Sequence, residues 1–130
     1  AFKNMYFKNI YVDGAKQALK IMGIPEMPVE NIQFKNMIIR SAIGIQINYA
    51  RKIDFENIDL RLEKPGIAAS FSNSQNVTVE SFKATGENQT FWVGGASTKE
   101  ISLKTNAEKM VFGKDINVLE SIKDQVKIME

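Results

Sequence analysis

The sequence predicts an all-β fold, a parallel β-helix of about five coils with three short strands in each coil. Two observations lead to this prediction: a seven-residue pattern recurs five times, and apolar and polar residues alternate within each copy. The 130 residues are 44% hydrophobic and 25% charged, a composition that favours one folded domain with a real core over a disordered chain. We therefore expect residues 1–130 to form a single β-helix domain.

The repeated pattern is clearest at residues 31–37 (NIQFKNM) and recurs at 4–10, 52–58, 76–82 and 100–106. Its fourth position is apolar in every copy, occupied by Phe7, Phe34, Phe55, Val79 and Leu103. Successive copies are therefore 34−7=27, 55−34=21, 79−55=24 and 103−79=24 residues apart. A period of about 20 to 27 residues is typical of a solenoid, and helical repeats need about 33 residues or more.

Within each copy the residue pattern predicts a strand, a corner and a second strand. Ile32 and Phe34 point to one side and Gln33 to the other, which is the period of a half-buried strand. Asn36 interrupts the alternation, and asparagine tolerates the left-handed backbone that a sharp bend needs. If the coils stack, their corner amides form a ladder that bonds from coil to coil. We expect this ladder at Asn9, Asn36 and Asn57, with Ser81 and Thr105 at the same place in the weaker copies.

The aromatic residues of the first three copies predict a stacked core of Phe7, Phe34 and Phe55. No single coil can bury its inward row, whereas stacked coils bury a continuous column. Burial of a large apolar side chain contributes ~1.5–3 kcal/mol, so this column is a substantial part of the stability.

A third strand is expected after the second strand of each coil, at 18–22, 44–48, 68–72, 90–93 and 109–112. Turn-forming stretches rich in glycine, proline, asparagine and serine separate these elements. Residues 121–130 depart from the repeat, and they are expected to form either a final strand or a cap over the last coil.

Composition excludes several classes of function. The net charge of +2 is too small to indicate a nucleic-acid partner. No apolar run approaches the ~20 residues of a membrane span. Cysteine and histidine are both absent, which removes thiolate chemistry, serine–histidine catalysis and the commonest zinc ligand. We expect no cofactor and no metal site.

The chain begins Ala1-Phe2-Lys3 and enters the repeat within a few residues, without a visible leader or N-terminal cap. We interpret it as a piece of a longer β-helix protein. An open first coil would also allow self-association through that end.

The repeat, together with residues 23–28 (GIPEMP) leading into 29–32 (VENI), resembles the family 28 glycoside hydrolases. These are polygalacturonase-like, pectin-degrading enzymes, and the resemblance is to their bacterial, Bacteroides-like members. It implies a right-handed, single-stranded parallel β-helix and inverting hydrolysis by carboxyl groups ~6.5–9.5 Å apart. It also implies a secreted or periplasmic protein whose partner is a pectic oligosaccharide or polysaccharide.

The catalytic motifs of that family are absent here: Asn-Thr-Asp, Asp-Asp, Gly-His-Gly and Arg-x-Lys. The resemblance therefore implies the C-terminal coils of such an enzyme, with its carboxylate pair upstream, and no catalytic residue is assigned to this chain. Two non-enzymatic alternatives stay open, a carbohydrate-binding β-helix module and a purely structural repeat.

Substrate contacts are expected on the third strand of each coil, which corresponds to the cleft face of the family. Its outward row is predicted to contain Lys20, Gln46 and Ser70, and a cation such as Lys20 could meet a galacturonate carboxylate. A solvated lysine is the alternative. Trp92 could stack on a sugar, although packing under a loop is the more ordinary role for it.

Two carboxylate pairs have the composition of a general acid and base, Asp54 with Asp59 and Glu26 with Glu30. Asp54 is expected on the outward side of a regular strand, where a solvated carboxylate is the ordinary explanation. Glu26 is expected in a loop that it anchors through backbone amides. Neither pair is assigned a catalytic role.

Overall fold

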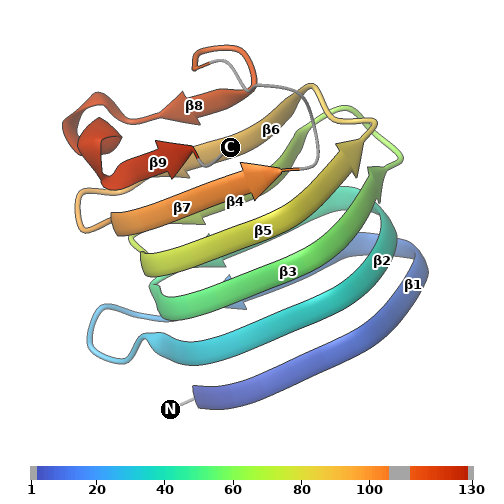
Figure 1. The fold of residues 1–130 in the computed structure, drawn as a ribbon, viewed down its shortest axis with the longest axis horizontal. Coiled ribbons are helices and arrows are strands. Elements are labelled where there is room, and N and C mark those ends of the chain that lie inside the picture. Colours follow the sequence, from blue (N-terminus) through green and yellow to red (C-terminus); the bar gives the residue numbers. More distant parts are fainter. Residues whose placement is uncertain (1–2, 106–111, 129–130) are drawn as a thin grey trace.

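The computed structural model describes residues 3–105 and 112–128, which form a parallel β-solenoid of about five coils (Figure 1). In Figure 1 the chain runs left to right along the near side and returns along the far side as the coils climb. The solenoid is therefore right-handed, as the sequence analysis predicted. The strands are β1 (Lys3–Met22), β2 (Val29–Asn48), β3 (Ala50–Leu62), β4 (Ile67–Ser72), β5 (Gln75–Thr85), β6 (Gln89–Gly94), β7 (Lys99–Thr105), β8 (Ile116–Val118) and β9 (Val126–Ile128).

Every pairing between these strands is parallel, and each strand pairs with the strand one coil away. On one side the order is β1, β2, β3, β5, β7 and β9, and on the other the second half of β2 continues to β4, β6 and β8. The register follows the sequence repeat, because Phe7 pairs with Phe34, Phe34 with Phe55 and Phe55 with Val79.

In β1, β2, β3 and β5 the first two strands predicted for the coil are one continuous strand with a bend, and in β1 and β2 the predicted third strand belongs to it as well. The bend is a single residue of left-handed backbone, at φ 57° for Asn9, Asn36 and Asn57 and at φ 56° for Ser81. Pairing continues on both sides of it, since one left-handed residue redirects the chain without interrupting the ladder. Thr105 was predicted to belong to this set, and that prediction is wrong. It pairs with Phe82 after a register shift, so β7 passes Ser81 without a matching corner residue.

The corner amides form the expected ladder. Asn36 Nδ2 donates to Asn9 Oδ1 over 3.1 Å, and Asn57 Nδ2 donates to Asn36 Oδ1 over 2.9 Å. Each amide therefore donates toward the N-terminal end of the solenoid and accepts from the coil that follows.

A second ladder, which the sequence analysis missed, stands at the first position of the repeat. All five copies have a left-handed residue there, namely Asn4, Asn31, Lys52, Asn76 and Glu100. Asn31 Nδ2 donates to Asn4 Oδ1 over 2.7 Å, but the next coil has a lysine, and the buried Asn31 Oδ1 has no partner. The leading asparagine of the motif was the signal for this corner.

Lys52→Asn is expected to raise the free energy of unfolding by about 1–2 kcal/mol. The new Nδ2 would donate to the unpaired Asn31 Oδ1, and asparagine is less strained than lysine at φ 54°. Urea denaturation measures the change, and Lys52→Gly is the matched control because it relieves the backbone strain without adding a donor. Equal stabilisation by the two variants would show that the hydrogen bond contributes nothing.

The predicted Phe stack is present, but it is not buried along its whole length. Ring centroids are 5.3 Å apart for Phe7 and Phe34 and 5.0 Å apart for Phe34 and Phe55, with 10° between the planes of each pair. Phe34 and Phe55 are 4% and 2% exposed, whereas Phe7 is 38% exposed because no described strand lies on its outer side.

The C-terminal end differs from the prediction in one strand. The third strand of the last coil is β8, at Ile116–Val118, where Ile116 pairs with Phe91. The predicted strand at 109–112 is wrong at Phe112, which forms only an isolated bridge, and 109–111 lie outside the described residues. Both expectations for the last residues hold: a 3-10 helix, η1 (Glu120–Gln125), buries Ile122 against the end of the core, and β9 pairs with β7.

Candidate functional site

The outward face of the third strands carries a row of polar side chains that includes one aromatic ring. Register places the row in the order Lys20, Gln46, Ser70, Trp92 and Asn117, one residue from each coil. The first three are the residues that the sequence analysis predicted for an outward row. Parallel strands lie ~4.8 Å apart, so each coil offers one side chain per step of about the length of a sugar ring.

Trp92 belongs to this row and is partly exposed. Its side chain is 37% exposed, and its neighbour one coil away is Ser70. A Cβ atom at Gly94 would come within 2.3 Å of the indole Cη2, so the ring lies down on the strand over this glycine. One face of the indole therefore packs on the sheet. The sequence analysis considered Trp92 for stacking on a sugar but did not include it in the predicted row of Lys20, Gln46 and Ser70.

The residues two positions before and after the row are small and mostly covered. Gly44, Ala68 and Gly94 are buried, and Ser72 is half-buried. Gln46 accepts a hydrogen bond from Gln17 over 3.1 Å, which holds its amide against the face.

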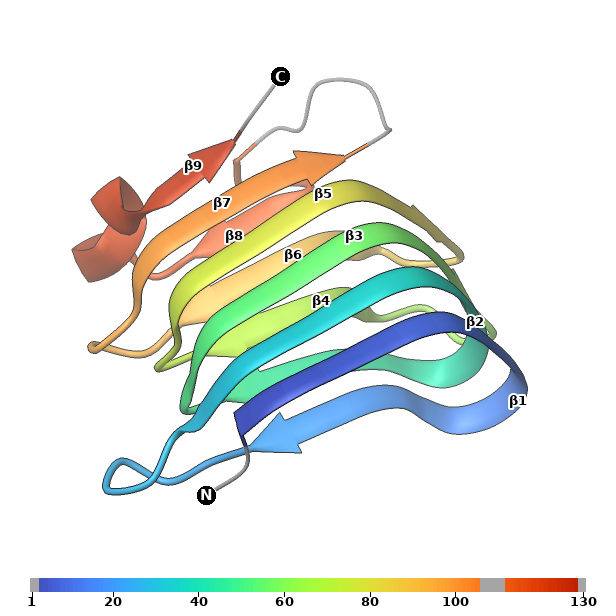
Figure 2. The same ribbon diagram turned by 60° about the horizontal axis from the view of Figure 1, so that its bottom comes forward.

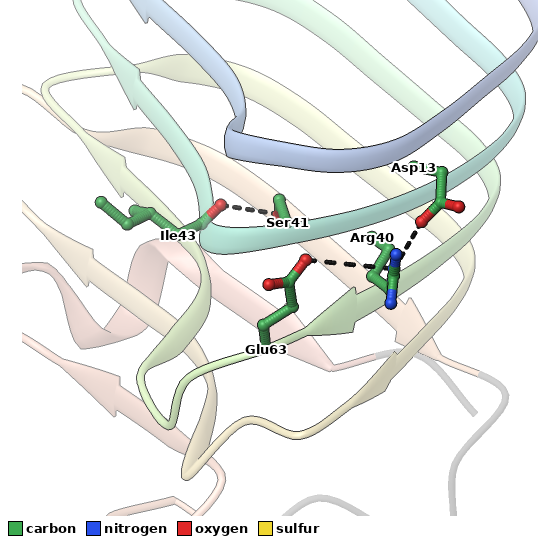
Figure 3. Close-up of polar contacts among 5 residues, drawn as sticks. All are labelled: Asp13, Arg40, Ser41, Ile43 and Glu63. Carbon is green, nitrogen blue, oxygen red and sulfur yellow. Dashed lines mark hydrogen bonds and ion pairs between the residues drawn. The ribbon is translucent and has the colours of Figure 1, made fainter.

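A second polar surface, which the sequence analysis did not identify, lies on the outward side of the second straight segment of each coil. It forms a cleft of about 260 Å³ lined by Tyr11, Val12, Asp13, Ile38, Arg40 and Arg61. Arg40 lies between the carboxylates of Asp13 and Glu63, and its Nε is 3.9 Å from Glu63 Oε1 (Figure 3). The coil spacing was the signal for this surface, since 13+27=40 and 40+21=61.

The charges of this cleft are already paired within the chain. Arg40 is bound by Asp13 and Glu63, and Arg61 Nη2 is 3.2 Å from Asp59 Oδ2. Half-exposed pairs of this kind contribute ~0–1 kcal/mol each. Beneath them, the buried Ser41 donates to the Ile43 carbonyl over 2.8 Å and fixes the bend that leads to the third strand (Figure 3). The arrangement is that of a surface ladder that aligns coils.

The carboxylate pairs weighed from the sequence do not share a site. Asp54 and Asp59 lie on either side of the Asn57 corner, and Asp59 is paired with Arg61. Glu26 is exposed in the 23–28 loop, whereas Glu30 Oε1 is 3.6 Å from Arg51. None of the four carboxylates lines the 260 Å³ cleft.

No protein-family model, curated protein or solved structure matches this chain. Within residues 3–105 and 112–128, no helix is long and apolar enough to cross a membrane. The same residues contain no group of three or more acidic side chains that could hold a metal ion.

Glu87 is the one carboxyl among the described residues whose pKa is clearly displaced. Burial raises its pKa above the ordinary value, a backbone hydrogen bond opposes the rise, and the nearby Asp115 charge adds to it. Its Oε2 is buried without a partner. A carboxyl that binds its proton more tightly when folded stabilises the fold at low pH, and this contribution is lost as the pH rises through the folded pKa.

Glu87→Gln is therefore expected to raise the melting temperature at pH 7 and to have no such effect near pH 4, where the wild-type carboxyl is largely protonated. Thermal unfolding followed by circular dichroism at the two pH values measures the difference. An equal shift at both pH values would show that ionisation of Glu87 is not the cause.

Proposed function

We propose that the chain forms non-catalytic coils of a polygalacturonase-like carbohydrate-active protein and contributes outer contacts to an acidic polysaccharide. The observation that carries this proposal is the third-strand row, in which an exposed indole follows a hydroxyl, an amide and a lysine at one residue per coil. Hydroxyl and amide groups can bond sugar hydroxyls, an indole face can stack on a sugar ring, and Lys20 can meet a uronate carboxylate.

The resemblance to family 28 glycoside hydrolases, which is strongest from Phe7 to Ile58, supports the choice of a pectic substrate. In this proposal the carboxylate pair is supplied by coils outside this chain, and the whole protein acts outside the cytoplasm, secreted or in the periplasm. The isolated 130 residues are expected to release no reducing ends from polygalacturonate.

Titration of the chain with oligogalacturonides is expected to change the fluorescence of Trp92 saturably. Trp92 is the only tryptophan, so the signal reports on this face alone. Trp92→Ala is expected to weaken binding roughly three- to tenfold in calorimetry, since aromatic stacking contributes ~0.5–1.5 kcal/mol. Lys20→Gln is expected to weaken binding of acidic but not of neutral oligosaccharides.

Tyr11→Ala is the matched control, because Tyr11 is an exposed aromatic side chain on the other outward surface. It should leave the affinity unchanged. If no oligosaccharide alters the fluorescence or the heat signal, the purely structural role stands in place of the binding role. Hydrolysis at an enzyme-like rate would contradict the non-catalytic assignment.

A further inference from the structure

The N-terminal end of the solenoid exposes the interior of its first coil. Figure 2 turns this end forward, with the two halves of β1 enclosing it. It contains a cavity of about 640 Å³ lined mainly by apolar side chains of β1 and β2, among them Phe7, Ile10, Phe34 and Met37. The 38% exposed ring of Phe7 forms part of this wall. At the opposite end, η1 and Ile122 cover the core.

The backbone at this end is also unpaired. β1 is 20 residues long and pairs along its length with β2, and no described strand pairs with its other edge. A long free edge presents a row of N–H and C=O groups that bind another strand readily.

The two asparagine ladders place hydrogen-bond donors along this edge. Asn36 donates through Nδ2 toward the N-terminal end and accepts through Oδ1 from the following coil. Asn4 and Asn9 accept in the same manner from Asn31 and Asn36, so repetition of the ladder directs their Nδ2 groups to the open end. No described residue accepts a hydrogen bond from either group. The open end therefore offers two amide donors on either side of an aromatic face.

We propose that this end binds one further β-solenoid coil, which lies parallel to β1 on the side away from β2. The covering coil has acceptor side chains above Asn4 and Asn9 and an apolar or aromatic side chain above Phe7. It would extend the same coil-to-coil interface that joins β1 to β2, with the same register and the same amide ladder.

A second copy of the chain fits this end poorly. Two open ends brought face to face would direct the Asn4 and Asn9 donors of both copies at each other. In a head-to-tail arrangement the copy would offer β8 and β9, which have three residues each and cannot match the 20 residues of β1.

The test uses the 130-residue chain and a fluorescent peptide with the sequence of residues 29–48, which would place Asn31, Phe34 and Asn36 above Asn4, Phe7 and Asn9. We expect saturable binding by fluorescence anisotropy. The double variant Asn4→Asp and Asn9→Asp is expected to bind about tenfold more weakly, through loss of two donors. Aspartate tolerates the left-handed backbone and still accepts from the next coil, so the change is confined to the outward donors.

A second peptide, with Asn31 and Asn36 both replaced by glycine, keeps the bends but lacks the acceptors and is expected to bind about tenfold more weakly as well. An unchanged Trp92 emission spectrum verifies that the protein variant is folded. Equal binding by the wild type and the Asn4/Asn9 variant, binding of a scrambled peptide, or no binding would overturn the proposal. A wild-type dimer in sedimentation velocity that excludes the peptide would also overturn it, in favour of a second copy.

Discussion

Replacement of Phe55 by alanine is expected to lower the free energy of unfolding by about 3–5 kcal/mol. Phe55 is 2% exposed and stacks on Phe34 at 5.0 Å, and its other neighbour is Phe71 at 6.3 Å. Truncation leaves a cavity in the middle of the column, and the coils on either side are held apart by their own backbone pairing, so they cannot close it.

Phe7→Ala is the matched control for this prediction. Among the described residues, Phe7 stacks on the ring of Phe34 alone and is 38% exposed, so its truncation removes less buried surface and leaves no enclosed cavity. Urea denaturation of the two variants measures the contrast, and we expect the loss at Phe7 to be less than half of that at Phe55. Similar losses would show that the first coil is covered in solution as well as the third.

Replacement of Gly44 by alanine is expected to destabilise the fold by about 3 kcal/mol, the upper part of the range for overpacked cores. A Cβ atom at this position would lie 2.1 Å from the carbonyl oxygen of Ala68 and 2.6 Å from that of Ile67. Both obstacles are backbone atoms of the next coil, so no side chain can rotate away. The coils would have to separate where β2 pairs with β4.

Gly66→Ala is the corresponding control, because a Cβ atom there meets nothing within 4 Å. This substitution is expected to be neutral or to stabilise by up to ~1 kcal/mol through the unfolded chain. Thermal unfolding followed by far-ultraviolet circular dichroism compares the two variants. A melting temperature for Gly44→Ala equal to that of the wild type would contradict the close approach of the two coils.

Most of the fold could be predicted because each coil of a solenoid repeats the same local pattern of strand and corner. The alternation around Phe34 and the break at Asn36 describe a strand and a corner from neighbouring residues alone, and the spacing of the copies then aligns the coils. The Asn9, Asn36 and Asn57 ladder was therefore accessible from the sequence, and the structure confirms it. The wrongly predicted strand at 109–112 lies in a region where the repeated pattern is weak. The neighbouring residues therefore did not distinguish it from the true strand at Ile116–Val118.

The candidate site was less accessible, because a row of side chains across coils depends on register. Lys20, Gln46 and Ser70 were aligned correctly, but continuing the row to Trp92 required the pairing of β4 with β6. Likewise, the partners of Arg40 come from residues 27 positions earlier and 23 positions later, since 40−13=27 and 63−40=23.

A stack of parallel strands can be predicted from the sequence alone, since the period-two alternation and the recurring asparagine act within a few residues of each other. Which side chains meet and which stay uncovered depends on the contacts between coils. Phe7 and Phe34 occupy the same position of the motif, yet only Phe34 is buried, because burial depends on a coil on each side. Residues that touch between coils are more than 20 positions apart in the sequence. The residues around Phe7 therefore do not indicate whether a coil covers it.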